Sequence, residues 1–279
     1  MITVVTVCRN AGKDIAKTIE SVLAQDYEDF EYIIKDGASE DDTVEIAKSY
    51  LDRFKERGIP CRIVTEKDSG LYDAMNLGAQ LALGEFVIFL NSGDCFFENG
   101  VLWKIFCGKD HKGTDIIYGD AVEEEFGEYY FYRKCPELIE ERMPFNHQTV
   151  FARRDLLREM PFDTDLAITA DYDFLLKAKK AGKVFKDSGV VTALISKDGV
   201  STVKLKDTYL ESMEVRRKYG IKIPDSQMME KELKMVKLKQ FGMDHFPRWV
   251  KYCIRKIQRV KRKQKRLKVI HTERGYEIV

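Results

Sequence analysis

Short apolar runs alternate with amphipathic segments along the first hundred residues. The clearest run covers residues 86–90, where five consecutive apolar side chains indicate a strand that is buried on both faces. Three further runs are rich in β-branched and aromatic residues and also end in polar residues: 2–7, 30–34 and 61–65. Between the runs, apolar positions recur at helical spacing, which predicts helices over 15–23, 44–54 and 71–81.

Strands that alternate with helices predict βαβ units and a mostly parallel sheet. Right-handed crossovers place the loops that follow such strands along one edge of the sheet, where open α/β proteins bind ligands. Asp36, Asp68 and Asp94 each follow a different predicted strand. The sequence therefore predicts that three carboxylates converge at one edge. A carboxylate there is suited to a divalent cation that in turn holds a diphosphate.

Five segments, in this order and spacing, resemble the family 2 glycosyltransferases, which are inverting enzymes of the GT-A fold that use nucleotide sugars. The segments are residues 4–11, 35–43, 66–78, 91–94 and 170–176. The resemblance covers roughly residues 1–220, and the third segment is similar to members that build surface polysaccharides. It implies an α/β fold of GT-A type, with a Rossmann-like, mostly parallel sheet flanked by helices.

Two of these segments depart from the family motifs. Residues 35–43 resemble the D-D-x-S-x-D-x-T motif, but Lys35 replaces the first acid and Asp36 keeps the second. Residues 91–94 occupy the place of the metal-binding D-x-D-type motif and retain only its last carboxylate, Asp94. We therefore expect Asp94 to be the only protein carboxylate on a Mg²⁺ or Mn²⁺ ion.

The resemblance also implies roles for individual residues. Those expected to bind the nucleotide sugar are Thr6, Cys8, Arg9, Asn10, Asp36, Asp68, Asn76, Asn91, Gly93 and Asp94. Those expected on the acceptor and diphosphate side are His147, Gln148 and Ser201. Because histidine titrates near neutrality, the sequence alone leaves His147 open as a catalytic base, although a lone histidine is more often structural or a hydrogen-bond donor.

A carboxylate after Ala170 is the preferred candidate for the general base. Asp171 and Asp173 are two positions apart, so on a helix they point in different directions. Asp171 stands at the predicted helix start, where its side chain can face the cleft, whereas Asp173 suits an ordinary first-turn acid. The family motif also matches Asp171 to the base, which would deprotonate the acceptor hydroxyl in one inverting displacement.

The near-zero net charge of +1 hides a strongly basic C-terminal part. Residues 231–270 contain 15 Lys and Arg residues and two acids. Within this part, apolar residues repeat at helical spacing: Phe246, Trp249, Val250, Cys253, Ile254, Ile257 and Val260. A basic amphipathic helix of this kind suits an anionic membrane surface. Docking on the enzyme's own core and binding to nucleic acid are the alternatives.

The chain of 279 residues suits one large domain plus an appendage. We expect a glycosyltransferase domain over 1–220, with a nucleotide-sugar half (about 1–95) and an acceptor half (about 96–220), and a basic helical extension over 221–279. No apolar run approaches the ~20 residues that span a bilayer, and the six cysteines show no paired spacing for zinc or a disulfide framework. These features favour a soluble, cytoplasmic enzyme at the inner face of the plasma membrane.

The predicted reaction is metal-dependent transfer of a sugar from a nucleotide-diphosphate donor, UDP-linked by expectation, to a hydroxyl of a glycan or lipid-linked acceptor in surface polysaccharide synthesis. Two other classes remain open. A sugar-phosphate nucleotidyltransferase shares the sheet and the metal-bound nucleotide, but residues 8–12 are a poor version of its glycine-rich loop. A non-catalytic nucleotide-sugar-binding scaffold is favoured by Lys35 and Asn91, which each stand where the family motif has an acid.

Overall fold

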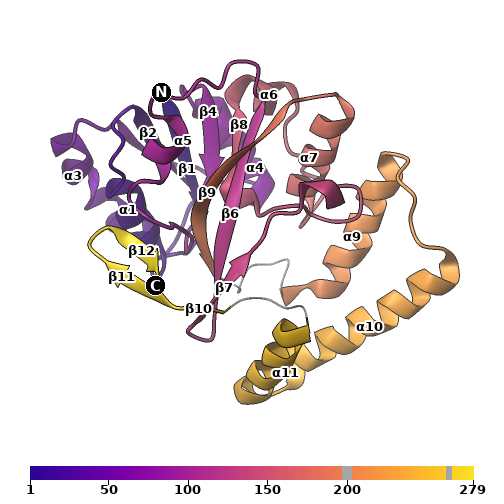
Figure 1. Cartoon of the computed structure of the whole chain (residues 1–279). Helices are drawn as coiled ribbons and strands as arrows, with labels where there is room; N and C mark the ends of the chain where they lie inside the picture. Colours follow the sequence, from indigo (N-terminus) through magenta and orange to yellow (C-terminus); the bar gives the residue numbers. More distant parts are fainter. Residues whose placement is uncertain (197–202, 262–265) are drawn as a thin grey trace.

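The computed structural model describes residues 1–196, 203–261 and 266–279, without the side chains of 257–261 (Figure 1). Its centre is a mixed ten-stranded sheet whose main path has the order β10-β7-β6-β8-β4-β1-β2-β3. The strands are β1 (Ile2–Cys8), β2 (Phe30–Asp36), β3 (Cys61–Thr65), β4 (Phe86–Phe89), β5 (Cys95–Phe96), β6 (Ile116–Glu125), β7 (Glu128–Tyr132), β8 (Val150–Arg153), β9 (Phe185–Ser196) and β10 (Arg266–Leu267).

Helices cover both faces of this sheet (Figure 1). The helices are α1 (Ile15–Leu23), α2 (Thr43–Lys48), α3 (Leu51–Glu56), α4 (Leu71–Leu81), α5 (Val101–Phe106), α6 (Arg154–Glu159), α7 (Ala170–Lys180), α9 (Leu205–Lys218), α10 (Ser226–His245) and α11 (Arg248–Lys261). None of the helices in the described residues is long and apolar enough to cross a bilayer.

The N-terminal half has the predicted βαβ arrangement. Strand β1 pairs in parallel with β2 and β4, and β2 pairs in parallel with β3. One predicted element differs, because residues 44–54 form two helices, α2 and α3, instead of one. The Ser49 hydroxyl donates to the carbonyl of Ile46 at 2.7 Å, a local bond that competes with continuation of the helix.

The second half of the sheet is mostly antiparallel. Strand β8 pairs antiparallel with both β4 and β6, and β9 runs parallel to β6. Strands β6 and β7 form a hairpin that turns at Phe126 and Gly127, whose φ angles are 56° and 76°. Two successive residues with positive φ give the turn a twist that matches the paired strands.

The core consists of two apolar layers, one on each side of the sheet. Alternate residues of β1 face opposite layers, so Val5 packs toward α4 and α7 while Val4 packs toward α1. Gly78 lets α4 approach the sheet closely, because a Cβ at this position would lie 2.6 Å from Cγ1 of Val5. This packing holds α4 against β1, two elements whose neighbouring loops belong to the predicted site.

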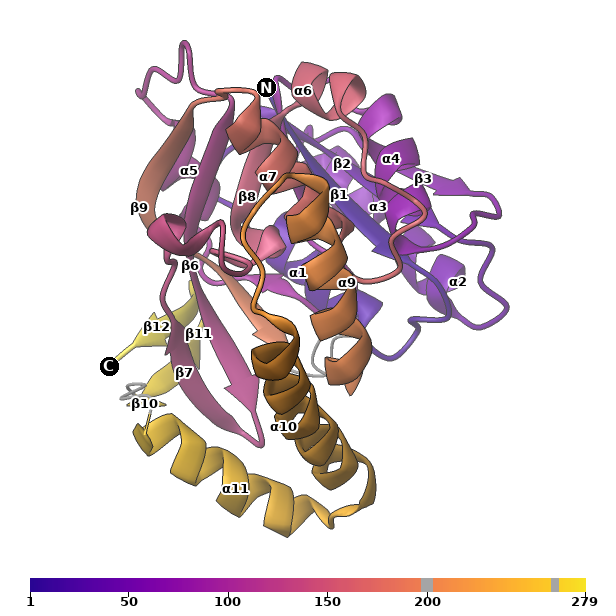
Figure 2. The ribbon, with the colours of Figure 1, turned by 90° about the vertical axis from the view of Figure 1, so that its right-hand side faces the viewer.

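The C-terminal part only partly matches the predicted helical extension. Helices α10 and α11 form an arm at the end of the molecule toward which β1 runs (Figures 1 and 2). Residues 266–279 are strands instead, because β10 extends the sheet beside β7, and β11 (Val269–Thr272) pairs with β12 (Gly275–Ile278). Tyr276 N donates to the carbonyl of Phe97 at 2.7 Å, which anchors this hairpin on the main domain.

Candidate active site

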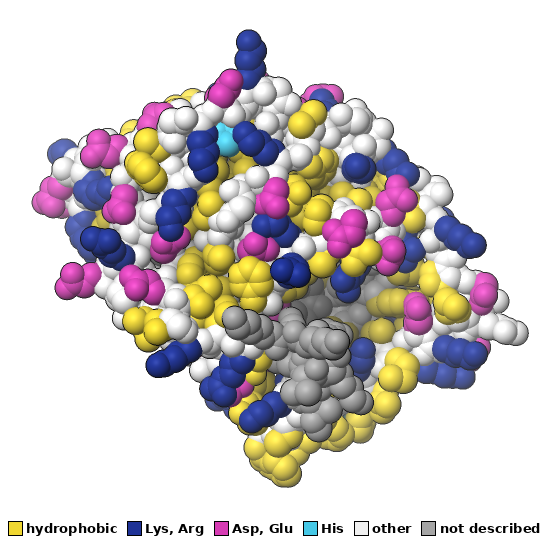
Figure 3. Space-filling model, in the orientation of Figure 1, with side chains coloured by type: hydrophobic (Ala, Val, Ile, Leu, Met, Phe, Trp, Pro, Cys, Tyr) yellow, Lys and Arg dark blue, Asp and Glu magenta, His cyan; other side chains and the backbone are white. Residues whose placement is uncertain are grey.

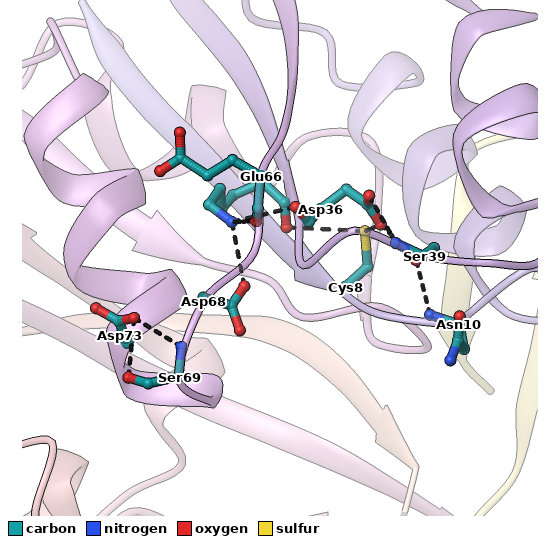
Figure 4. Close-up of polar contacts among 9 residues, drawn as sticks. Cys8, Asn10, Asp36, Ser39, Glu66, Asp68, Ser69 and Asp73 are labelled. Carbon is teal, nitrogen blue, oxygen red and sulfur yellow. Dashed lines mark hydrogen bonds and ion pairs between the residues drawn. The ribbon is translucent and has the colours of Figure 1, made fainter.

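The loop after β2 is held by a buried carboxylate. Asp36 has no exposed surface, and its Oδ2 accepts a hydrogen bond from Ser39 N at 3.0 Å while Oδ1 accepts from the Ser39 hydroxyl. Ser39 Oγ in turn accepts from Asn10 N at 2.8 Å (Figure 4). Asp36 therefore fixes its own loop, and its direct contact with the donor stays a prediction.

The side chain of Lys35 connects the ends of β2 and β3. Its fully buried ammonium donates to the carbonyls of Glu66 (2.7 Å) and Asp36 (3.1 Å) and to Oδ2 of Asp68 (3.1 Å). A buried charge needs such a set of partners. The lysine in place of the family acid is thus a clamp between two site loops. Its one sequence signal is a charged residue directly after the apolar residues 32–34 of β2.

The surface of this region is formed by Arg9 and Asn10, which are exposed at the end of β1. Gly37 lies tightly between Asp68 and Arg9, since a Cβ there would be 2.8 Å from Oδ2 of Asp68 and 3.4 Å from Cβ of Arg9. Asn10 and Ala38 have φ angles of 51° and 59°, a left-handed conformation that costs most non-glycine residues about 1–2 kcal/mol. Such strain is typical of loops with a fixed functional shape.

Three predicted donor-binding residues support the site from within. Thr6 is fully buried, and its hydroxyl donates to the carbonyl of Leu90 at 2.7 Å. Burial raises the pKa of the Cys8 thiol to about 12, so the thiol stays protonated. The side-chain amide of Asn76 donates to the carbonyl of Phe162 and accepts from the N–H of Phe162, at 2.9 Å each. Thr6, Cys8 and Asn76 thus have partners inside the protein, and their direct contact with the donor stays a prediction.

The turn after β4 carries the predicted metal ligand. Asp94 is only 7% exposed, and burial raises the pKa of its carboxyl to about 6. Gln148 Nε2 donates to Oδ2 of Asp94 at 2.8 Å. Gly93 permits the turn with a φ of 96°, and its N–H donates to Oγ1 of Thr18 at 2.9 Å.

The donor atoms around Asp94 fit a hard divalent cation. Asn91 Oδ1, Ser92 Oγ and Gln148 Oε1 are buried and lack a hydrogen-bond partner within the described ranges. Carboxylate and amide oxygens are suitable ligands for Mg²⁺ or Mn²⁺. The described residues contain no group of three or more His, Cys, Asp or Glu side chains that would hold a metal by themselves. The set therefore suits a cation that phosphate oxygens also coordinate.

The candidate base is connected to the same turn through His147. Asp171 is the second residue of α7, and its Oδ2 lies 3.1 Å from Nδ1 of His147. Nε2 of His147 lies 3.1 Å from Nδ2 of Asn91. With the amide nitrogen as donor, Nε2 must accept, so Nδ1 carries the proton and donates to Asp171. Tyr172 N and the Tyr72 hydroxyl also donate to Oδ1 of Asp171, at 2.8 and 3.2 Å.

The neighbouring acid has different partners. Asp173 is 2% exposed, and its Oδ1 lies 2.9 Å from Nζ of Lys218 and accepts from the Tyr219 hydroxyl at 3.1 Å. Asp173 thus ties α7 to α9, while Asp171 remains beside His147. Ser201, expected near the diphosphate, lies outside the described residues.

The family model described as glycosyl transferase family 2 matches residues 3–163. The chain belongs to this family. A PGL/p-HBAD biosynthesis glycosyltransferase of Mycobacterium bovis is 28% identical to this glycosyltransferase over 232 residues, which cover 80% of this chain and 88% of that protein. A relative named glycosyltransferase GlyG, from Streptococcus pneumoniae, is 30% identical over 47% of this chain and 43% of its own length.

Solved structures confirm the predicted GT-A fold. S. aureus TarS 1-349, solved with UDP-GlcNAc, has a TM-score of 0.64 at 17% identity and covers 87% of this glycosyltransferase and 72% of its own chain. The mannosyltransferase PcManGT of Pyrobaculum calidifontis, solved with GDP-Man and Mn²⁺, has a TM-score of 0.60 at 16% identity. Its match covers 88% of this chain and 70% of its own.

Proposed function

We propose that this protein is an inverting glycosyltransferase that moves a sugar from a UDP-linked donor to a hydroxyl of a glycan or lipid-linked acceptor in surface polysaccharide synthesis. The observation that carries the proposal is the chain of contacts from Asn91 through His147 to Asp171. It couples a carboxylate base to the turn that holds Asp94. In this proposal residues 1–95 bind the donor and residues 96–220 the acceptor.

On the donor side, Arg9 and Asn10 are the exposed groups that would bind the nucleotide, with Asp68 beneath them. The clamp of Lys35 and the loop held by Asp36 would keep these groups in place without a change of shape on binding. TarS solved with UDP-GlcNAc supports a UDP-sugar as the donor.

The departing diphosphate gains negative charge as the bond to the anomeric carbon breaks. Asp94, with the oxygens of Asn91 and Gln148, would hold Mg²⁺ or Mn²⁺ against it. When bound, the cation would neutralise that charge as a Lewis acid. The Mn²⁺ in the PcManGT structure supports this choice of metal.

The attacking acceptor hydroxyl must lose its proton on the opposite face of the sugar. Asp171 would take that proton as general base. His147 would act as a positioning residue, since its Nδ1–H holds one carboxylate oxygen and leaves the carboxylate at a fixed place beside the donor turn. A single displacement of this kind inverts the anomeric configuration.

A donor screen tests this function. The protein is incubated with a panel of UDP- and GDP-sugars and Mn²⁺ or Mg²⁺, and released nucleoside diphosphate is measured. We expect release with one donor class and none after Asp94→Ala substitution or addition of EDTA. Full activity under either condition would contradict the metal role of Asp94. Pyrophosphate release from NTP and sugar phosphate would instead indicate a nucleotidyltransferase, and tight donor binding without turnover a scaffold.

A further inference from the structure

Helix α10 carries apolar side chains on two faces, and only one of these faces packs on the rest of the protein. Its inner face lies along α9, where Gln240 Nε2 donates to the carbonyl of Val203 and the Tyr209 hydroxyl donates to Glu232, both at 2.8 Å. None of its residues is fully buried. Its exposed large apolar residues are Met228, Met235, Leu238 and Phe241. Leu238 is 65% exposed, so packing on the domain does not explain this second face.

The exposed apolar surface continues across the turn into α11. Phe246 is exposed, and Trp249 at 69% is more exposed still. Another side of α11 is docked, because the Tyr252 hydroxyl donates to Glu128 at 3.1 Å and Arg255 Nε lies 3.3 Å from Glu125. Self-docking thus accounts for one side of this helix and leaves Trp249 outside. Figure 3 shows apolar side chains gathered along the lower edge of the molecule, over this arm.

Basic residues accompany the apolar ones. Residues 226–256 contain eight Lys and Arg residues and three acids, and residues 257–268 add seven basic residues and no acid. On α10, Lys231 is four residues before Met235 and Lys234 is four before Leu238, so each pair shares a face. Exposed apolar side chains bordered by cations match the interfacial region of an anionic bilayer.

We infer that the outer face of α10, continued by Phe246 and Trp249, is a membrane-binding surface for anionic lipid. This surface includes α10 in addition to the basic segment around α11 that the sequence indicates. The inference adds a membrane-binding surface to the proposed function. It rests on that function only where it names a lipid-linked acceptor. The arm lies at the end of the molecule toward which β1 and β2 run, and the site loops follow those strand ends (Figures 1 and 2). A bilayer below the arm would place a lipid-linked acceptor on the side where the strands that carry the site loops end.

Vesicle co-sedimentation of the full-length chain tests the surface. We compare vesicles of phosphatidylcholine alone with equimolar phosphatidylcholine and phosphatidylglycerol. The wild type should bind only the anionic vesicles, and high salt should weaken but not abolish binding, because salt screens the charges and not the apolar contacts. The pair Leu238→Ser and Trp249→Ser should lower vesicle affinity at least ~10-fold.

The pair Leu83→Ser and Trp103→Ser is the matched control, because these side chains are 59% and 53% exposed on the main domain. The control should bind vesicles like the wild type, and both variants should keep the wild-type circular dichroism spectrum and melting temperature. Equal binding to neutral vesicles, or equal loss in the control, would overturn the inference. So would binding to duplex DNA without binding to vesicles, or a self-association that the arm variant abolishes without any vesicle binding.

The readout is independent of catalysis. Neither Leu238 nor Trp249 belongs to the proposed active site, so the arm variant should keep nucleoside diphosphate release in detergent-free solution. A failure to bind vesicles would leave the transferase proposal intact. A failure of turnover with every donor would leave the lipid-binding surface intact.

Discussion

Asp171 and Asp173 lie two residues apart on α7 but serve different parts of the protein. Because Asp171 lies beside His147 and is the proposed base, Asp171→Asn should lower kcat at least ~10²-fold, a typical contribution of a general base, with little change in donor affinity. Asp173→Asn should mainly lower the melting temperature, because it weakens the ion pair between this buried carboxylate and the half-exposed Lys218. Steady-state kinetics and thermal unfolding of both variants test which carboxylate is the base. A larger kcat loss in Asp173→Asn than in Asp171→Asn would identify Asp173 as the base.

His147 supplies the donor that holds Asp171 in place. His147→Ala removes a hydrogen bond to a carboxylate and should lower kcat ~10-fold or more, while the donor KM stays near the wild-type value. His147→Asn places an amide near the position of Nδ1 and should restore part of kcat. The positioning role predicts this split between kcat and KM. An equal effect of the two variants, or a large rise in donor KM, would argue against it.

Asp94, the proposed metal ligand, carries a cost in stability. Its folded pKa of about 6 lies above the ordinary value of 3.8, so the folded protein binds this proton more tightly than the unfolded chain. Stability therefore falls as pH rises from about 4 to about 6, and the full penalty, on the order of 3 kcal/mol, persists above pH 6. Asp94→Asn removes the charge but can still accept from Gln148.

We therefore expect Asp94→Asn to raise the free energy of unfolding at pH 8, in the absence of metal and nucleotide, and to leave it nearly unchanged at pH 4. Denaturant titrations at the two pH values measure this difference. The same variant should lose turnover. A gain that is equal at both pH values would show that the carboxylate charge is not the cause.

Among the elements, α7 depends on α9 for its start. The Glu211 carboxylate on α9 accepts the backbone N–H groups of Ala167, Ile168 and Thr169 at 2.6 to 2.8 Å. Thr169, the residue before α7, forms no side-chain cap of its own. Glu211→Ala should lower the free energy of unfolding by about 2–3 kcal/mol, because it leaves several donors without an acceptor. It should also lower kcat, since Asp171 follows directly.

Glu214→Ala is the control for this element, because Glu214 is exposed on the same helix. It should change the free energy of unfolding by less than about 0.5 kcal/mol. Urea unfolding of both variants gives the comparison. Similar values for the two would mean that α7 starts without help from α9.

The sequence predicts elements well where one local pattern decides them. The parallel strands, α1 and α4 follow from apolar runs and helical periodicity. Residues 266–279 do not, because β10 finds its partner β7 far away in the chain. Likewise, the motifs locate Asp94 and Asp171, but they do not tell that Asp36 and Asn76 turn toward backbone groups. Lys35 and Glu211 act through contacts between elements, which a local pattern does not contain.

At the scale of the whole molecule, the residues that follow the arm return to the main domain and pack on it. Leu267 is buried in a cluster with Phe97, and Tyr276 stacks against Phe97 with ring centroids 6.3 Å apart. A truncation after Gly242 would remove these contacts together with α11. Point variants on the exposed face of the arm therefore test membrane binding more cleanly than a deletion does.

The proposed active site lies where the parallel and antiparallel halves of the sheet meet. Strand β4 pairs with β1 on one side and β8 on the other, and the turn after β4 carries Asn91 and Asp94. His147 and Gln148 come immediately before β8, so their contacts with that turn join the two halves. This arrangement supports a division into a donor half and an acceptor half with the reacting bond between them.

The anomeric configuration of the product tests this account most directly. With the donor identified in the screen, the first-formed sugar product is followed by proton NMR through its anomeric signal. A single displacement, with Asp171 as base and the diphosphate held at Asp94, predicts a configuration opposite to that of the donor. A product with the configuration of the donor would contradict the account, because retention requires a second displacement or a different path.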